Sequence, residues 1–349
     1  MTIRTTFAAC AAAAAGLWLP PLCHAQSSVT LYGVMDVTVR HASNAASGGG
    51  SLNTVGDGYF GGSRLGFKGS ENLGGGLRAL YMLEMGIDPS TGLLLQSTAA
   101  ANYGQAASAS SRAFGRESWV GLSSATWGAL TFGRQYTLAH QAAARIQPMG
   151  NPNADAVIVL SNHHMARQDN MVKYAKEFGP FDVAGSVTLS EGNGRGSGLS
   201  AGYRAAGFDA VLYGQNLSAA AGGEVRRIRG GGAAYQIAPS WKAFLAYMTR
   251  SHEISPQRNK VATAGLHYYA TPALTLTASY THDRQNTFGT NASGRRQVAW
   301  LSADYYLSKR TDLYAAVDHN KIGGGYVLPS FMATRGSQTG VTAGVRHRF

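Results

Sequence analysis

The sequence predicts an all-β fold, a 16-stranded antiparallel transmembrane β-barrel. Apolar and polar residues alternate with period two over most of the chain, and the connections between these segments alternate between short and long. After the N-terminal segment, no run of about 20 apolar residues could form a membrane helix. Charged residues make up only 14% of the 349 residues, whereas roughly 25% is usual in soluble domains.

The first 25 residues have the features of a secretory signal peptide. Arg4 supplies a positive start, and the apolar run Phe7–Leu19 is too short to span a bilayer. Two prolines end this run, and small residues before position 26 predict cleavage after Ala25. Residues 26–349 would then form the barrel. A short membrane anchor is the alternative, and a lipoprotein is disfavoured because Leu22 precedes Cys23.

Cysteine placement limits the chemistry of the exported chain. Both cysteines, Cys10 and Cys23, lie inside the expected signal peptide. The remaining chain would have no disulfide and no cysteine metal site, and we expect neither a metal nor a cofactor. An exported protein without disulfides needs another stabilising device, such as a closed barrel.

Strand alternation is clearest in Val29–Arg40. One face carries residues such as Leu31 and Val39, and the other carries residues such as Asp36 and Arg40. The same pattern recurs in segments 64–68, 77–85, 274–279, 313–318 and 341–349. Alternation by itself also fits a soluble antiparallel sheet, so it does not decide between water and lipid outside the barrel.

The connections favour the membrane barrel. Short turns are expected at residues 71–75, 123–127, 178–180, 205–207, 238–240, 270–272 and 308–310. Longer polar loops are expected at residues 41–58, 88–111, 137–166, 191–196, 218–227, 251–257, 285–294 and 321–336. Seven turns and eight loops join sixteen strands. Short periplasmic turns and long outer loops are typical of outer-membrane barrels, and an even count lets the last strand pair with the first.

The net charge of +12 is dispersed along the chain. The longest basic run is the pair Arg226-Arg227, with Arg229 nearby. Nucleic-acid-binding proteins usually concentrate such residues in a patch, so we expect no nucleic-acid partner. Single arginines within alternating segments suit the wall of a polar lumen.

Several segments resemble the general porin family of Gram-negative bacteria. They are VTLYG (29–33), SRLGFKGSENLG (63–74), RESWVGL (116–122), FGRQ (132–135), RQDN (167–170) leading to Tyr174, and the C-terminal strand ending in Phe349. The resemblance implies a sixteen-stranded barrel, usually a homotrimer, whose third loop folds into the lumen. It also implies that Phe349 ends a signal read by the barrel-assembly machinery.

The resemblance suggests which residues line the constriction. Arg64, Lys68 and Arg116 match basic wall positions of the family, and Arg167 matches another. Alternation independently places Arg64, Lys68 and Arg78 on the polar face, with Arg40 nearer the mouth; Arg134 is ambiguous, because it shares parity with outward-facing residues. Each of these could instead be an ordinary solvated lumen residue.

The third loop departs from the family pattern, which sets acids on this loop against the basic wall. Between residues 137 and 166 the only acid is Asp155, opposed by Arg145. Scarce loop acids would leave the wall arginines uncompensated, which predicts anion selectivity.

The expected function is passive diffusion of small hydrophilic solutes, including inorganic anions, through a porin in contact with outer-membrane lipid. A substrate-specific anion channel and a structural or adhesive barrel are the alternatives. Three motifs favour loops or structural roles over chemistry: His163-His164, the glycine-rich segment 192–196, and Asp318-His319-Asn320. None supplies metal-ligand spacing, a nucleotide-binding context or a nucleophile beside the histidine, so we expect no enzyme.

Overall fold

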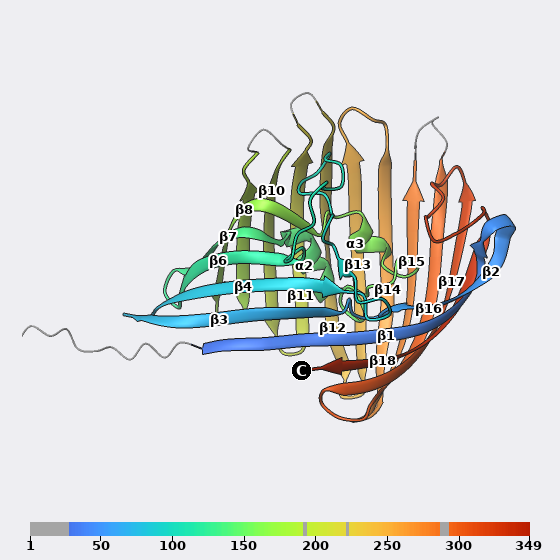
Figure 1. Cartoon of the computed structure of the whole chain (residues 1–349), viewed down its shortest axis with the longest axis horizontal. Coiled ribbons are helices and arrows are strands. Elements are labelled where there is room, and N and C mark those ends of the chain that lie inside the picture. The colour runs from blue at the N-terminus through green and yellow to red at the C-terminus, as the bar shows by residue number, and fades with distance from the viewer. Residues whose placement is uncertain (1–27, 191–193, 221–222, 287–292) are drawn as a thin grey trace, which may run out of the picture.

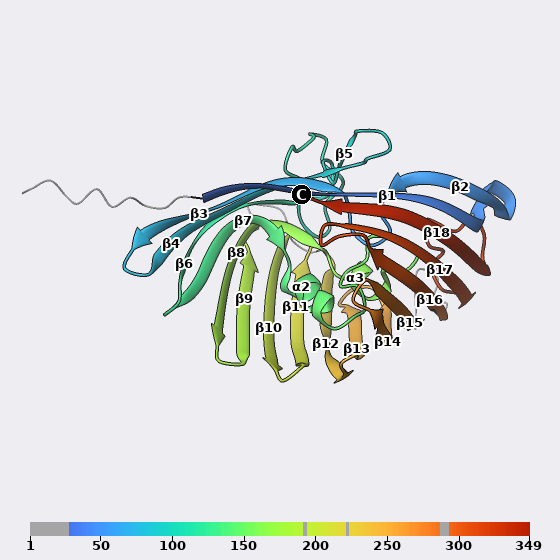
Figure 2. The same cartoon turned by 90° about the horizontal axis from the view of Figure 1, so that it is seen from below.

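The chain forms one antiparallel sheet that closes on itself. The computed structural model describes residues 28–190, 194–220, 223–286 and 293–349, so the expected signal peptide lies outside the described residues. Closure comes from pairing of the first strand, β1 (Ser28–Ala46), with the last, β18 (Ser337–Arg348), in the register Val37↔Val345. Figure 1 shows the wall from the side and Figure 2 shows the ring of strands from below.

Sixteen strands of the described chain make the wall, as predicted. Between β1 and β18 these are β3 (Arg64–Gly74), β4 (Leu77–Ile87), β6 (Glu117–Ser124), β7 (Gly128–Tyr136), β8 (Arg167–Phe178), β9 (Phe181–Thr188), β10 (Arg195–Ala205), β11 (Phe208–Ser218), β12 (Val225–Ala238), β13 (Trp241–His252), β14 (Arg258–Thr271), β15 (Leu274–Gln285), β16 (Gly294–Tyr306) and β17 (Thr311–Gly324). All seven expected short turns join strands at one end of the barrel.

The prediction of a loop at residues 41–58 is wrong. β1 continues to Ala46, turns through the 3₁₀ segment η2 (Ser47–Gly49), and returns as β2 (Gly50–Asp57). Gly48 and Gly49 have φ of 71° and 87°, which favours glycine and lets the chain reverse within a few residues. A second difference from the predicted loops is the short strand β5 (Leu94–Leu95), which lies in the second loop and pairs with β4.

The two faces of the wall follow the predicted alternation. On β1, Leu31 is 55% exposed on the outside, whereas Asp36 is fully buried on the inside. The last strand repeats this pattern, with Val345 exposed and Arg346 buried. Outward apolar side chains meet lipid, and inward polar side chains meet the lumen and its contents.

The third loop (residues 137–166) fills part of the lumen. It contains α2 (Leu138–Arg145) and α3 (Val159–Asn162), which lie inside the ring of strands in Figure 2. The Thr137 side chain caps α2 by accepting the backbone N–H of His140. Ile146 and Leu160 of this loop pack with wall residues such as Trp300, so the hydrophobic core sits inside the barrel. Among the described residues, no helix is long and apolar enough to cross a membrane.

Candidate functional site: the lumen beside the third loop

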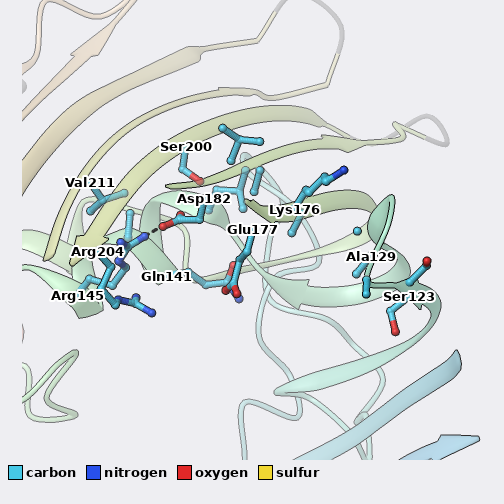
Figure 3. A pocket seen from close by; sticks show the side chains of 18 of the residues that line it. Ser123, Ala129, Gln141, Arg145, Lys176, Glu177, Asp182, Ser200, Arg204 and Val211 are labelled. Carbon is cyan, nitrogen blue, oxygen red and sulfur yellow. Dashed lines mark hydrogen bonds and ion pairs between the residues drawn. The ribbon is translucent and has the colours of Figure 1, made fainter. Parts of the chain in front are cut away.

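Ion pairs hold one end of α2 against the wall. Arg145 donates to Asp182 of β9 at 2.8 Å and to Asp209 of β11 at 2.5 Å. Figure 3 shows Arg145 and Asp182 joined among residues lining a cavity of about 720 Å³ near the short turns. The loop therefore presents a base to wall acids, the reverse of the charge arrangement that the family resemblance implies.

Three further contacts fix the rest of the loop. Asn153 donates to Asp57 at 2.9 Å, and Arg296 of β16 donates to the backbone oxygens of Asp155 and Ala156, both at 2.9 Å. His163 bonds to Asp283 of β15 at 2.7 Å. Because these anchors lie on β2, β15 and β16, whereas the Arg145 anchors lie on β9 and β11, the loop is stretched across the lumen.

A second cavity, of about 490 Å³, lies between the loop and the first strands of the wall. Its lining includes five arginines and neither aspartate nor glutamate: Arg64, Arg116, Arg167, Arg346 and Arg348. We call these five residues the arginine cluster. Three of its members, Arg64, Arg116 and Arg167, were predicted from the sequence.

The carboxylate of Glu84 lies behind two of these arginines. Arg116 is 4% exposed, and its Nε donates to Glu84 at 2.7 Å. The Nε of Arg64 lies 3.8 Å from the same carboxylate. Glu84 supplies one negative charge against these two positive charges, and the Glu117 side chain also interacts electrostatically with Arg116 and Arg167.

Tyr136, the last residue of β7, joins two arginines without neutralising either. Its hydroxyl accepts from Nη2 of Arg116 at 2.8 Å and also from Nη2 of Arg167. The Arg167 guanidinium lies 4.2 Å from the centre of the Tyr136 ring, and His140 stacks on that ring. Within the described chain, Arg167 forms no ion pair with a carboxylate.

Arg346 and Arg348 were not among the predicted site residues, although alternation had placed both on the inner face of the last strand. Arg346 contacts Asp304 at 3.0 Å and Asp312 at 2.8 Å, and Arg348 contacts Asp312 at 2.6 Å. Barrel closure brings β18 beside β1, and Val34 is the register partner of both Arg348 and Arg64. Alternation predicted that the side chains of Arg346 and Arg348 point inward. Which residues lie beside them follows only from the register in which β18 pairs with β1.

The other predicted residues lie elsewhere. Lys68 is exposed beside the Tyr32 ring, and Arg78 lines the 720 Å³ cavity. Arg40 is held by Asp318 through two hydrogen bonds of 2.6 and 3.0 Å. Asp155 is exposed on the third loop, where its backbone oxygen binds Arg296.

Arg134, whose orientation the sequence left open, is buried at the outer end of β7. It contacts Asp169 at 2.5 Å and the backbone oxygen of Gly115 at 2.8 Å. Arg112 of the second loop reaches the same aspartate at 3.4 Å. Arg134 therefore fastens the second loop to the wall, and a register shift at Gly133 accounts for its departure from simple alternation.

Burial favours the neutral form of the three histidines in the third loop. Burial, assisted by Arg167 and Arg116, lowers the pKa of His140 to about 3. Burial also lowers the pKa of His163 and, more strongly, that of His164. The charge of the arginine cluster is therefore independent of His140 near neutral pH.

The structure describes most of the three motifs set aside in the sequence. No group of three metal-ligating side chains forms within the described residues. Asp318 is buried on the inner face with Arg40, whereas His319 is exposed on the outer face beside Thr339. Part of the glycine-rich segment, residues 192 and 193, lies outside the described ranges.

Comparison with known proteins decides the family. A family model described as Gram-negative porin matches residues 6–325. The chain belongs to the Gram-negative porin family. The closed sixteen-stranded wall and the lumenal third loop agree with this assignment, which places the protein in the outer membrane and among channels rather than enzymes.

Two curated relatives are outer-membrane porins. One, from Bordetella pertussis, is 34% identical over 164 residues, covering 43% of this chain and 39% of that protein. The other, outer membrane porin protein 32 of Delftia acidovorans, is 30% identical over 207 residues, covering 57% and 54%. The matched part of the chain therefore spans about half or less of each relative.

Solved structures share the whole fold. The anion-selective porin from Comamonas acidovorans superposes with a TM-score of 0.74 at 23% identity, covering 93% of this porin and 100% of that chain. A loop-deletion form of OmpT, an outer membrane protein of Vibrio cholerae, gives 0.70 at 16% identity, covering 93% and 99%. At these identities the likeness concerns the fold.

Proposed function

We propose that this porin is a water-filled channel for passive diffusion of small hydrophilic solutes and that it prefers anions. The observation that carries the proposal is the lining of the 490 Å³ cavity, which contains five arginines and no acid. Charges of one sign in a narrow channel with low-dielectric walls sum to a field that attracts ions of opposite sign. The fold neighbour from Comamonas acidovorans is itself an anion-selective porin.

Arg64, Arg116 and Arg167 are the proposed selectivity residues. Arg167 contributes most to the field, since Tyr136 holds it in place without cancelling its charge. Arg346 and Arg348 contribute less, because Asp304 and Asp312 compensate them at distances of 2.6–3.0 Å.

The proposal extends to export and assembly. Residues 1–25 would be a cleaved signal peptide, and Phe349 would end the segment recognised by the barrel-assembly machinery. A homotrimer is supported by the fold shared with OmpT of Vibrio cholerae, which was solved in a trimer form. We propose no enzymatic activity and no cofactor.

The deciding experiment is the reversal potential across a salt gradient, measured in a planar bilayer. We expect the reversal potential of the wild-type porin to lie on the chloride side and Arg167→Gln to move it toward zero. Higher salt should weaken the preference for anions, because mobile ions then screen the arginine charges over a shorter distance. Arg310→Gln, in a short turn outside the lumen, is the matched control.

Other outcomes separate the alternatives. Reversal on the cation side would contradict anion selectivity and leave the channel in place. Conductance that saturates with one anion would favour a substrate-specific channel. Absence of conductance would favour a structural or adhesive barrel.

A further inference from the structure

Three basic residues meet on the outer wall at the loop end of the barrel. Lys260 of β14 is the direct register partner of Arg284 of β15, and Arg284 is the direct partner of Arg295 of β16. All three side chains are exposed, and their neighbours Asn259, Asp283 and Arg296 are buried on the lumen side. We call Lys260, Arg284 and Arg295 the basic row.

The basic row faces the lipid. Along the same strands and on the same face, Leu266, Leu276 and Leu301 are 40%, 39% and 63% exposed. These leucines line an apolar hollow of about 620 Å³ on the outer wall. The basic row is thus the loop-side continuation of the membrane-facing surface.

An aromatic residue fixes the depth of the row. Tyr280 is 45% exposed on the outer face of β15, four residues from Arg284. At about 3.4 Å per residue and a tilt near 40°, the row lies about 10 Å beyond this tyrosine, on the side of the long loops. Outward tyrosines mark the membrane interface, so the row lies at the level of lipid headgroups in the outer leaflet.

The row is electrostatically unfavourable by itself. Like charges directly opposite each other on neighbouring strands are destabilising, and this row contains two such pairs in succession. Within the described residues, no carboxylate forms an ion pair with Lys260, Arg284 or Arg295. Nearby bases add to the charge, since Arg258 and Lys321 are exposed on the same face of β14 and β17.

We propose that the basic row binds phosphate groups of lipid headgroups in the outer leaflet. Phosphate accepts several charge-assisted hydrogen bonds, and guanidinium groups match it in a bidentate manner. A bound headgroup would convert the repulsion among the three cations into shared attraction to one anion.

The test compares unfolding of the full porin in phosphatidylcholine bicelles with unfolding in bicelles that also contain phosphatidic acid, whose headgroup is a phosphate monoester. We expect phosphatidic acid to raise the midpoint temperature of the wild-type porin. The double variant Arg284→Gln with Arg295→Gln should lose this shift. In phosphatidylcholine alone, the same variant should be at least as stable as wild type, because the like-charge pairs are gone.

The control is Lys309→Gln with Arg310→Gln, which removes two exposed bases from a short turn at the opposite rim and should keep most of the shift. An equal shift in the Arg284/Arg295 variant would overturn the proposal. So would an equal shift produced by inorganic phosphate in phosphatidylcholine bicelles, since the site would then take the free anion. A loss of stability by the variant in phosphatidylcholine alone would show that the row serves the fold and not the lipid.

Discussion

Gly33 and Phe349 exchange two backbone hydrogen bonds where the barrel closes. The Gly33 N–H donates to the Phe349 oxygen at 3.0 Å, and the Phe349 N–H donates to the Gly33 oxygen at 3.1 Å. The phenyl ring lies over Gly33, in the space that a Cβ atom at this position would occupy. The C-terminal residue thus extends the β1–β18 pairing by one step and covers a glycine on the membrane side.

Gly33→Ala is expected to weaken barrel closure, because the added methyl group must displace the Phe349 ring. Overpacking of a core typically costs about 1–3 kcal/mol, and the cost here should lie at or below the lower end because the Phe349 ring is exposed and can move. The measurement is the urea midpoint of refolding into detergent micelles. Gly56→Ala in β2 is the control, since nothing lies within 4 Å of a Cβ there. Equal midpoints for the two variants would contradict this account of closure.

Tyr136→Phe is expected to move the reversal potential toward zero. The change removes the hydroxyl that Arg116 and Arg167 share, so Arg167 loses the hydrogen bond that positions its guanidinium, whereas Arg116 keeps its bond to Glu84. A hydrogen bond to a charged group contributes about 1.5–3 kcal/mol. Tyr174→Phe, which removes a hydroxyl bonded to Trp127 on the outer wall, should leave the potential unchanged. If both variants behave as wild type, Tyr136 does not position the arginines.

Arg145→Gln is expected to loosen α2. The variant leaves Asp182 and Asp209 without the base that holds the helix end. Because the Arg145 side chain is partly exposed, the cost should fall below the roughly 3–5 kcal/mol of a fully buried pair. Amide hydrogen exchange across residues 138–145 should accelerate. Arg204→Gln is the control, since the Arg204 side chain is 60% exposed where it pairs with Asp209. Unchanged exchange in Arg145→Gln would show that other contacts fix α2.

The Glu224 carboxylate is expected to hold residues 253–255 of a neighbouring outer loop in a pH-dependent manner, and we call this contact the clamp. Its carboxylate accepts backbone N–H groups of residues 253, 254 and 255 at 2.7–2.8 Å. Burial opposes ionisation, but these hydrogen bonds outweigh it and lower the pKa of Glu224 from 4.5 to about 2. A depressed folded pKa stabilises the clamp above pH 4.5, and the contribution is lost as pH falls toward 2.

The measurement is amide exchange at residues 253–255 after correction for intrinsic pH dependence. In wild type, protection should fall over this pH window, whereas in Glu224→Gln it should be low and flat. Glu253→Gln, which removes an exposed partner of Arg227, should keep the wild-type profile. A flat wild-type profile would contradict the clamp.

The fold could be predicted from the sequence because each strand carries its own signal. In Val29–Arg40, alternation depends only on neighbouring residues, and from Val34 onward the structure follows it, with Val34, Asp36 and Thr38 buried and the residues between them more exposed. The hairpin at residues 41–57 was missed because its polar, glycine-rich composition resembles a loop. Its strand pairing depends on β1 continuing beyond the membrane, which no local pattern records.

The constriction was predictable only in part. Arg64 and Arg116 could be found because they lie in family motifs, and Arg346 could be placed on the inner face by alternation. Whether an inward arginine stands free or is neutralised depends on distant residues. Arg40 is neutralised by Asp318, which is 278 positions away.

The sequence by itself determined the strands, their two faces, the turns and the excess of positive charge, because these follow from residue type and spacing along one segment. Only the tertiary structure decided which charges meet. Closure of β1 on β18 brings Arg348 level with Arg64, and the wall acids Asp182 and Asp209 hold Arg145 of the third loop. The register between β14, β15 and β16 sets Lys260, Arg284 and Arg295 side by side. The register of strand pairing brings together side chains that are far apart in the sequence. Electrostatic energy depends on the distance between charges in space, so it cannot be derived from the sequence of one segment.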